Sequence, residues 1–111
     1  MSEHDTLARL AAVIQSRRKG SANNSYTRQL LDAGAERCAK KFGEEAVEAV
    51  IAGVTKDPHA LAQEAADTLY HLLVLLEVNR VPLADVMAIL DGRMGTSGLD
   101  EKAARPRESG A

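Results

Sequence analysis

This chain of 111 residues carries a formal net charge of −2 at pH 7 and has a pI near 5.9. The length predicts a single domain with a small core, and the slightly acidic charge argues against a nucleic-acid-binding protein, which would normally show a clustered basic face. One Phe, two Tyr and no Trp leave the 45% hydrophobic content mostly to Ala, Leu and Val, a composition that suits close-packed helices.

The cellular compartment is predicted from signals that are missing. The single cysteine, Cys38, has no partner for an internal disulfide, and residues 1–5 lack the basic and apolar regions of a signal peptide. No apolar stretch approaches the ~20 residues that are needed to cross a bilayer. We therefore expect a cytoplasmic protein that has no membrane partner.

Apolar residues recur with the period of a helix along most of the chain, and no run alternates as a strand would. The expected fold is therefore all-α, a bundle of about four to five helices. The first helix is predicted from about Asp5, its N-cap, to about Arg18, and residues 19–24 follow as a loop.

A short second helix and a long third helix come next. Ser25 is predicted to cap the second helix, which runs through Leu31 and stops at Gly34. The third helix is predicted over about residues 35–53, with one apolar and one charged side. The apolar side consists of Cys38, Ala39, Phe42, Ala46, Ala49 and Val50, and the charged side of Arg37, Lys41, Glu44, Glu45 and Glu48. We therefore expect the acids of this helix to face away from the core.

The fourth helix is predicted to start at Asp57 and Pro58, because an N-cap acid before a proline at the first helical position favours a helix start. It continues to about Asn79, and its segment 69–76 is apolar on nearly every side, as in a helix that is buried all round. Each large aliphatic side chain left in water forfeits roughly 1.5–3 kcal/mol. Because a monomer of this size would struggle to cover the segment, we expect a homodimer.

The last predicted helix opens at Pro82 and ends near Gly95. Residues 1–94 would then form one all-α domain. Gly, Ser, Pro and charged residues make up most of residues 95–111, and this composition predicts a flexible C-terminal tail.

Two carboxylate pairs, Glu45-x-x-Glu48 and Glu64-x-x-Asp67, carry most of the functional signal. Each spacing places both acids on one helical face, and Glu44 adds another acid within one turn of the first pair. Like charges so placed cost roughly a few tenths of a kcal/mol each, and a cation would remove that cost. Carboxylates select Mg²⁺ or Mn²⁺, and Mg²⁺ often shares its site with substrate phosphates. The pattern favours metal-dependent hydrolysis of a phosphoanhydride; the alternative is a solvated acidic stripe.

Three ordered segments carry a resemblance to a known family, and together they span about residues 25–93. They are Ser25-Tyr26-Thr27 with Leu30, then Lys40-Lys41-Phe42-Gly43-Glu44-Glu45-Ala46-Val47-Glu48, and then Glu64-Ala65-Ala66-Asp67-Thr68-Leu69-Tyr70-His71-Leu72-Leu73-Val74-Leu75-Leu76. The combination closely resembles the phosphoribosyl-ATP pyrophosphohydrolases, the histidine-biosynthesis branch of the MazG-like all-α nucleotide pyrophosphohydrolases. The acidic pattern marks the superfamily, and the Ser-Tyr-Thr and Tyr-His-Leu-Leu stretches point to the histidine branch.

The resemblance implies a MazG-like helical bundle and an activity. The expected reaction is hydrolysis of the α–β anhydride of phosphoribosyl-ATP to phosphoribosyl-AMP and pyrophosphate, the second step of histidine biosynthesis. It would depend on Mg²⁺, with Mn²⁺ as a substitute. In some organisms this activity is fused to the cyclohydrolase that takes the product, and the length here leaves no room for that domain. A separate cyclohydrolase is therefore implied.

The resemblance also assigns residue roles. The metal ligands are Glu45, Glu48, Glu64 and Asp67, on which the superfamily pattern falls residue by residue. The catalytic set is Glu44 and Glu45, with Glu44 orienting or deprotonating the attacking water unless it is a plain surface acid. The substrate-binding set is Ser25, Tyr26, Lys40, Lys41 and His71.

Several of these roles have a structural alternative. The two lysines either meet phosphates or pair with acids one turn further on, and Lys41 is preferred for phosphate because it shares the acidic face. Tyr26 either contacts the substrate or packs at a helix start. His71 lies on the stripe of the second carboxylate pair, yet a histidine in an apolar helix is more often structural. Arg28 and Arg37 are further phosphate candidates.

Three other functions are compatible with parts of the sequence. A MazG-like enzyme acting on another standard, damaged or deoxynucleoside triphosphate would share every acid, so only the Ser-Tyr-Thr and Tyr-His segments and a substrate panel discriminate against it. A di-iron carboxylate bundle would need Glu-x-x-His motifs on paired helices, and the sequence has none. A non-catalytic helical adaptor would show no metal dependence and would tolerate Glu48→Gln.

Overall fold

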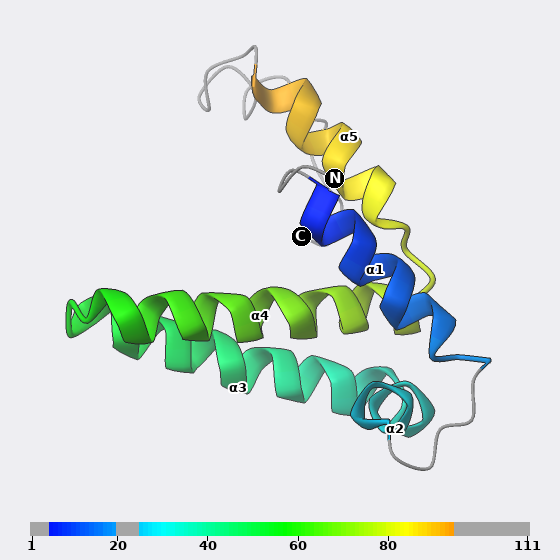
Figure 1. Cartoon of the computed structure of the whole chain (residues 1–111), viewed down its shortest axis with the longest axis horizontal. Helices are drawn as coiled ribbons and strands as arrows, with labels where there is room; N and C mark the ends of the chain where they lie inside the picture. The colour runs from blue at the N-terminus through cyan, green and yellow to red at the C-terminus, as the bar shows by residue number, and fades with distance from the viewer. Residues whose placement is uncertain (1–4, 20–24, 95–111) are drawn as a thin grey trace, which may run out of the picture.

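The computed structural model describes residues 5–19 and 25–94, which form five helices and no strand within these two stretches (Figure 1). The all-α expectation is therefore confirmed for the described residues. The tail predicted over residues 95–111, and all but the first residue of the loop predicted over residues 19–24, lie outside them. No helix in the described part of the chain is long and apolar enough to cross a membrane.

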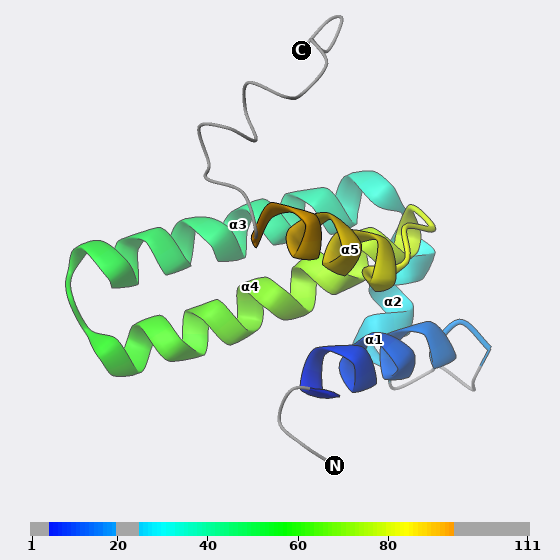
Figure 2. The same ribbon diagram turned by 90° about the horizontal axis from the view of Figure 1, so that it is seen from above.

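The helices α3 (Ala35–Val54) and α4 (Pro58–Val78) lie side by side as an antiparallel hairpin (Figures 1 and 2). The turn between them begins as a Schellman motif, in which the amides of Lys56 and Asp57 donate to the carbonyls of Gly53 and Ala52. Lys56 adopts the left-handed conformation that this motif requires, with φ of 59°. The side chain of Asp57 then caps α4 by accepting from the amide of Ala60 at 3.1 Å, which confirms the predicted helix start.

The helices α1 (Thr6–Ser16) and α2 (Tyr26–Ala33) pack at the end of the hairpin far from this turn (Figure 2). The buried core there consists of Ile14, Leu30, Leu31, Cys38, Leu73 and Val74. Ser25 caps α2 as predicted, because its hydroxyl accepts from the amide of Arg28 at 3.1 Å. Asp5 precedes α1 without a side-chain cap. Its backbone is in the helical region, whereas a capping residue needs an extended conformation.

The prediction that all the acids of α3 face away from the core is wrong for Glu45. Glu45 is half-buried on the side of α3 that faces α4, together with Phe42 and Ala49. Ala39 and Val50, which were predicted on the apolar core side, are exposed. The outer face of α3 carries four large apolar side chains that are exposed: Val47, Val50, Ile51 and Val54. Because apolar residues lie on both sides of this helix, a helical wheel that takes the apolar side as the buried one gives the wrong core side.

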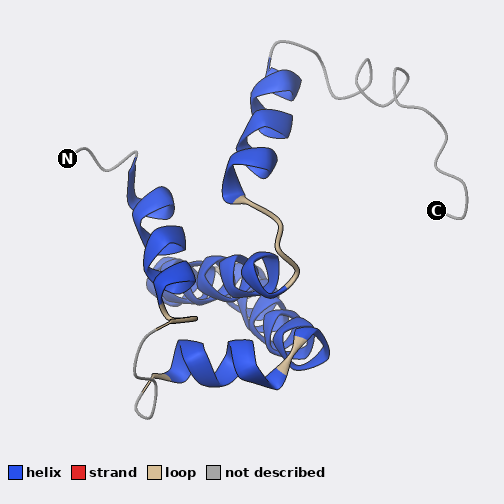
Figure 3. Cartoon of the chain, turned by 90° about the vertical axis from the view of Figure 1, so that its right-hand side faces the viewer, coloured by secondary structure: helices blue, strands red, loops and turns tan. Residues whose placement is uncertain are grey.

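The apolar segment 69–76 of α4 is only partly covered by this chain. His71, Leu73 and Val74 are buried, whereas 43% of Leu69 is exposed, so burial on all sides is not achieved within the described chain. The last helix, α5 (Leu83–Met94), has no buried residue and stands away from the α3–α4 hairpin (Figure 3). The predicted opening residue, Pro82, directly precedes it.

The packing of the core predicts that alanine substitutions at two neighbouring residues of α1 lower the free energy of unfolding by different amounts. Ile14 is 1% exposed and contacts the core, whereas Val13 is 45% exposed. Ile14→Ala should lower the free energy of unfolding by about 2–5 kcal/mol, because it removes buried methyl groups and leaves a cavity. The control, Val13→Ala, should change it by less than about 0.5 kcal/mol. Urea denaturation measures both, and equal losses would contradict the packing of α1.

Candidate metal and substrate site

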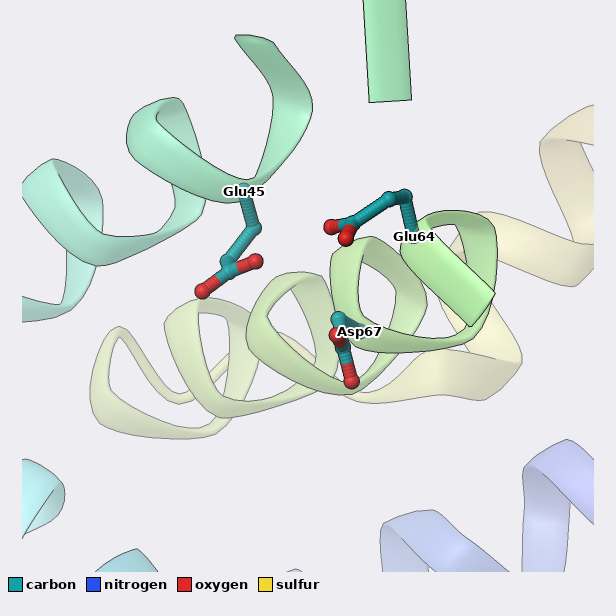
Figure 4. A group of neighbouring side chains, drawn as sticks. All are labelled: Glu45, Glu64 and Asp67. Atoms are coloured by element: carbon teal, nitrogen blue, oxygen red, sulfur yellow. The ribbon is translucent and has the colours of Figure 1, made fainter. Parts of the chain in front are cut away.

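Carboxylates from two helices converge between α3 and α4. Glu45 extends from α3, Glu64 extends from α4 toward it, and Asp67 lies on α4 beside them (Figure 4). One oxygen atom from each carboxylate lies within 4.8 Å of the other two. Glu45 and Glu64 are half-buried and Asp67 is exposed, so the cluster opens to solvent on one side. Three of the four predicted metal ligands are thus brought together, and Glu48 is outside this group.

The hydroxyl of Thr68 lies between the two helices at the level of the cluster. It is 2.7 Å from the carbonyl oxygen of Glu64, one turn back in α4, and 3.1 Å from the carbonyl oxygen of Glu45 in α3. The first contact is common for a helical threonine. The second holds the backbone of Glu45 beside the turn that carries the other two acids. Thr68 therefore links the two backbones at the level where the carboxylates meet.

The negative charges of the cluster repel one another, and this repulsion is seen at Glu64. The pKa of Glu64 is raised, first by desolvation and then by the negative charges of Asp67, Glu45 and Glu48. The contribution of Glu48 shows that this exposed acid lies near the cluster although it is not one of the three converging groups. A cation between the carboxylates would reverse these repulsions.

The predicted lysines differ in position. Lys41 Nζ lies 3.4 Å from Oε1 of Glu44, an i,i+3 ion pair in which the Lys41 side chain is 24% exposed. The lysine therefore pairs with an acid three residues on. Lys40 is exposed and lies about 140° around the helix from Glu45 at 100° per residue. The structure therefore does not bring Lys40 to the cluster.

An aromatic group adjoins the carboxylates on the side of α2. The rings of Tyr26 and Tyr70 are stacked with centroids 6.4 Å apart, and both rings meet His71 edge-on, at 6.0 Å from Tyr26 and 4.9 Å from Tyr70. Thr27 Oγ1 and the Tyr70 hydroxyl share a hydrogen bond of 2.5 Å. Tyr26 and His71, both predicted to bind substrate, are therefore in contact, and Tyr26 remains 48% exposed.

His71 connects the aromatic group with the acids. It is 6% exposed, and burial lowers the pKa of its imidazole; the charge of Lys41 adds to this lowering, whereas Glu45 and Asp67 partly oppose it. Its location one turn after Asp67 places it directly behind the carboxylates. A histidine with a lowered pKa is neutral at physiological pH, so it has both a hydrogen-bond donor and an acceptor.

Two other residues named in the sequence analysis, Arg28 and Cys38, make contacts within the fold. The Arg28 guanidinium donates to both carboxylate oxygens of Asp32, at 3.0 and 3.1 Å, and to the carbonyl of Arg18 at 2.9 Å. Cys38 is buried, which raises the pKa of its thiol, and it donates to the carbonyl of Leu30. Arg37 is exposed on α3.

The sequence interpretation did not assign site roles to Thr27, Thr68 and Tyr70. Thr27 and Tyr70 lie in the segments that pointed to the histidine branch, so a signal was present but was read only as a family marker. Thr68 lies in the third resembling segment, but nothing in that pattern indicates its second hydrogen bond, which depends on how closely α3 approaches α4.

The arrangement is suited to holding a hard divalent cation. All three converging ligand atoms are carboxylate oxygens, the donors that Mg²⁺ and Mn²⁺ prefer. Mg²⁺ holds oxygen ligands at about 2.0–2.1 Å, so two ligands are at most about 4 Å apart. Small side-chain rotations from the present spacing would satisfy that geometry, and the exposed side of the cluster leaves room for a ligand carrying phosphates.

Comparison with known proteins identifies the family. Residues 7–94 match the family described as phosphoribosyl-ATP pyrophosphohydrolase. A relative from Cereibacter sphaeroides is 56% identical over 99 residues, which cover 89% of this chain and 96% of that protein. Relatives from Nitrobacter winogradskyi and Agrobacterium fabrum are each 52% identical, over 93% and 91% of this chain and 89% and 94% of their own lengths. All three are named phosphoribosyl-ATP pyrophosphatase.

The fold and the comparisons place this chain among all-α hydrolases. More specifically, it belongs to the phosphoribosyl-ATP pyrophosphohydrolase family, as its motifs predicted.

The raised pKa of Glu64 predicts a pH-dependent stability in metal-free protein. An acid whose pKa is raised by folding holds its proton more tightly when folded, so its charged form opposes folding above that pKa. Glu64→Gln should therefore raise the thermal midpoint at pH 7 in EDTA. The gain should vanish below the ordinary glutamate pKa of about 4.3, where both states are protonated.

Glu36, in the first turn of α3, provides the control for this measurement. Glu36→Gln should bring no such gain at either pH, because it removes an acid that lies favourably at a helix start. Calorimetric scans at pH 7 and pH 4 measure both variants. A Glu64→Gln midpoint equal to that of wild type at pH 7 would contradict the proposed repulsion.

Proposed function

We propose that this protein hydrolyses the α–β phosphoanhydride of phosphoribosyl-ATP to phosphoribosyl-AMP and pyrophosphate, the second step of histidine biosynthesis. The observation that carries this proposal is the convergence of Glu45, Glu64 and Asp67 between α3 and α4. It occurs in a chain whose relatives are named for an activity on this nucleotide. A polyphosphate substrate needs its charge neutralised, and this cluster is suited to a cation that would do so.

The proposed metal is Mg²⁺, with Mn²⁺ as a substitute, and its protein ligands would be Glu45, Glu48, Glu64 and Asp67. When bound, it would supply Lewis-acid polarisation of the phosphates and a more acidic water. Glu48 would join the other three by a side-chain rotation, since it follows Glu45 by three residues on the same helix.

The remaining polar groups are proposed to act on water and phosphates. Glu44 is the proposed acceptor of a proton from the attacking water, together with Glu45. The Lys41 ammonium lies 3.4 Å from Glu44 and would contact a substrate phosphate. Lys40 would need a different path to the substrate, because it lies on another side of α3.

The base and ribose are proposed to lie against α2. Tyr26 exposes 48% of its surface beside His71, and a half-exposed ring of this kind can stack on a planar base. The neutral imidazole of His71 can offer one hydrogen bond to the nucleotide. Ser25 caps α2 and thereby fixes the backbone next to Tyr26, and its proposed substrate contact would be made in addition to that role.

The function is tested by incubating the protein with phosphoribosyl-ATP and a panel of nucleoside triphosphates, with and without Mg²⁺. Phosphorus NMR should show pyrophosphate as the product, and kcat/KM should favour phosphoribosyl-ATP over ATP by at least about tenfold, which needs only about 1.4 kcal/mol from contacts to the added ribose phosphate. Release of orthophosphate would overturn the α–β assignment. Equal turnover of ATP or a deoxynucleoside triphosphate would instead indicate another MazG-like specificity.

Substitutions in the carboxylate cluster test which residues this activity needs, and a substitution outside the cluster is the control. Glu45→Gln and Asp67→Asn should each lower kcat by about 10²-fold or more, the loss expected when a group that stabilises transition-state charge is removed. Glu36→Gln, on the same helix but outside the cluster, should retain wild-type activity. Unchanged turnover and metal affinity in both cluster variants would refute the assignment of the ligands.

We further propose that the protein is a homodimer. A groove of about 670 Å³ lies between α1, the C-terminal part of α4 and α5, and apolar residues that include Leu76, Leu83 and Met87 line it. Elsewhere on α5, Ile89 and Leu90 are also exposed, although neither lines this groove. An apolar surface of this kind is costly in water. A second copy of the chain would cover it together with the partly exposed segment 69–76.

The dimer predicts a specific effect of charge in the groove. Met87→Glu should weaken self-association at least about tenfold, because it places a charge in the apolar interface. Ala62→Glu, on the exposed N-terminal half of α4, should have no effect. Analytical ultracentrifugation at micromolar concentration measures both. A folded wild-type monomer under these conditions would contradict the proposal.

A further inference from the structure

The hydrogen bond between Thr27 and Tyr70 joins α2 to α4 beside the carboxylate cluster. The two hydroxyl oxygens are 2.5 Å apart in a partly buried environment, and 43 residues of sequence separate them. Desolvation raises the pKa of Tyr70, so its phenol keeps its proton at physiological pH and can serve as the donor. Neither residue is among the groups assigned above to the metal, the attacking water or the substrate.

This bond determines where the rings of the aromatic group lie. Tyr70 is anchored at its hydroxyl by Thr27, and its ring then stacks on Tyr26 with an interplanar angle of 22°. The edge of His71 closes the group at 4.9 Å from the Tyr70 ring. Tyr26 is the first residue of α2, and its ring contacts both Tyr70 and His71.

The supported ring keeps about half of its surface exposed and contacts the histidine that follows the acids of α4. Tyr26 is 48% exposed, and His71 behind it lies one turn after Asp67. A nucleotide with its phosphates at the carboxylates would have its planar base within reach of that ring. A ring that was free to rotate would lose entropy on stacking, whereas a fixed ring would not.

We infer that Thr27 and Tyr70 are positioning residues, which hold the ring of Tyr26 in place to stack on the purine base of the substrate. This role rests on the proposed function, because it requires a nucleotide at the carboxylate cluster. It predicts that breaking the hydrogen bond weakens nucleotide binding without disturbing the metal site or the chemical step.

The test uses variants that remove or keep the hydroxyl groups. Thr27→Val and Tyr70→Phe each remove one partner of the bond at nearly constant volume, and Thr27→Ser keeps it. The first two should raise the Kd for AMP and the KM for phosphoribosyl-ATP by roughly threefold to tenfold, the range produced by losing one aromatic contact. Their kcat and their affinity for Mn²⁺ should stay within about twofold of wild type. Thr27→Ser should match wild type throughout.

Tyrosine fluorescence provides a direct readout, because Tyr26 and Tyr70 are the only tyrosines and the chain has no tryptophan. In Tyr70→Phe all emission comes from Tyr26, so quenching by saturating AMP reports stacking on that ring. Tyr26→Phe leaves Tyr70 alone as the control for absorption by the nucleotide. Its emission should be quenched less than that of Tyr70→Phe.

The outcomes separate this role from the proposed function. Wild-type protein that does not hydrolyse phosphoribosyl-ATP would defeat the proposed function itself. Wild-type turnover with unchanged AMP affinity in Thr27→Val would defeat only the positioning role. A parallel loss of kcat, Mn²⁺ affinity and AMP affinity that Thr27→Ser does not restore would show that the bond merely stabilises the fold, and would also overturn the inference.

Discussion

The close packing of α3 on α4 is the constraint on which the site depends. Small residues on the facing side of α3, such as Ala49 and Ala52, let the two backbones approach. The hydroxyl of Thr68 can therefore reach the carbonyl of Glu45 on the other helix. Once the helices are this close, the carboxylate of Glu45 lies within 4.8 Å of those of Glu64 and Asp67. The hydrophobic packing of the hairpin forces like charges together, and the resulting repulsion is what suits the cluster to a cation.

The rest of the chain places further groups around this hairpin. Two side-chain caps, from Ser25 and Asp57, fix where α2 and α4 begin. The Schellman motif at Lys56 turns the chain back after α3. Arg18 binds both the carboxylate and the carbonyl oxygen of Glu77, and so holds the end of α1 against α4. These local bonds bring α2 and its tyrosine to the side of the hairpin where the acids lie.

Stability and function make opposite demands on α4. Its C-terminal half supplies the core residues Leu73 and Val74, and its N-terminal half supplies the half-buried Glu64 and the exposed Asp67. His71 lies at the boundary, buried and neutral between the aromatic rings and the carboxylates. The groove beside α5, lined by residues such as Leu76 and Leu83, is open in the described part of the chain. This is why the assembly is proposed together with the activity.

The sequence by itself determined the five helices, the caps at Ser25 and Asp57, and the family, because these depend on local periodicity, local hydrogen bonds and ordered motifs. It did not determine which side of α3 is buried, since Val47, Val50 and Val54 are large apolar residues that lie exposed on the outer face. Only the tertiary structure decided that Glu45 rather than Glu48 converges with α4, and that Thr27 meets Tyr70. Both results depend on the approach of segments far apart in the chain, which no local pattern encodes.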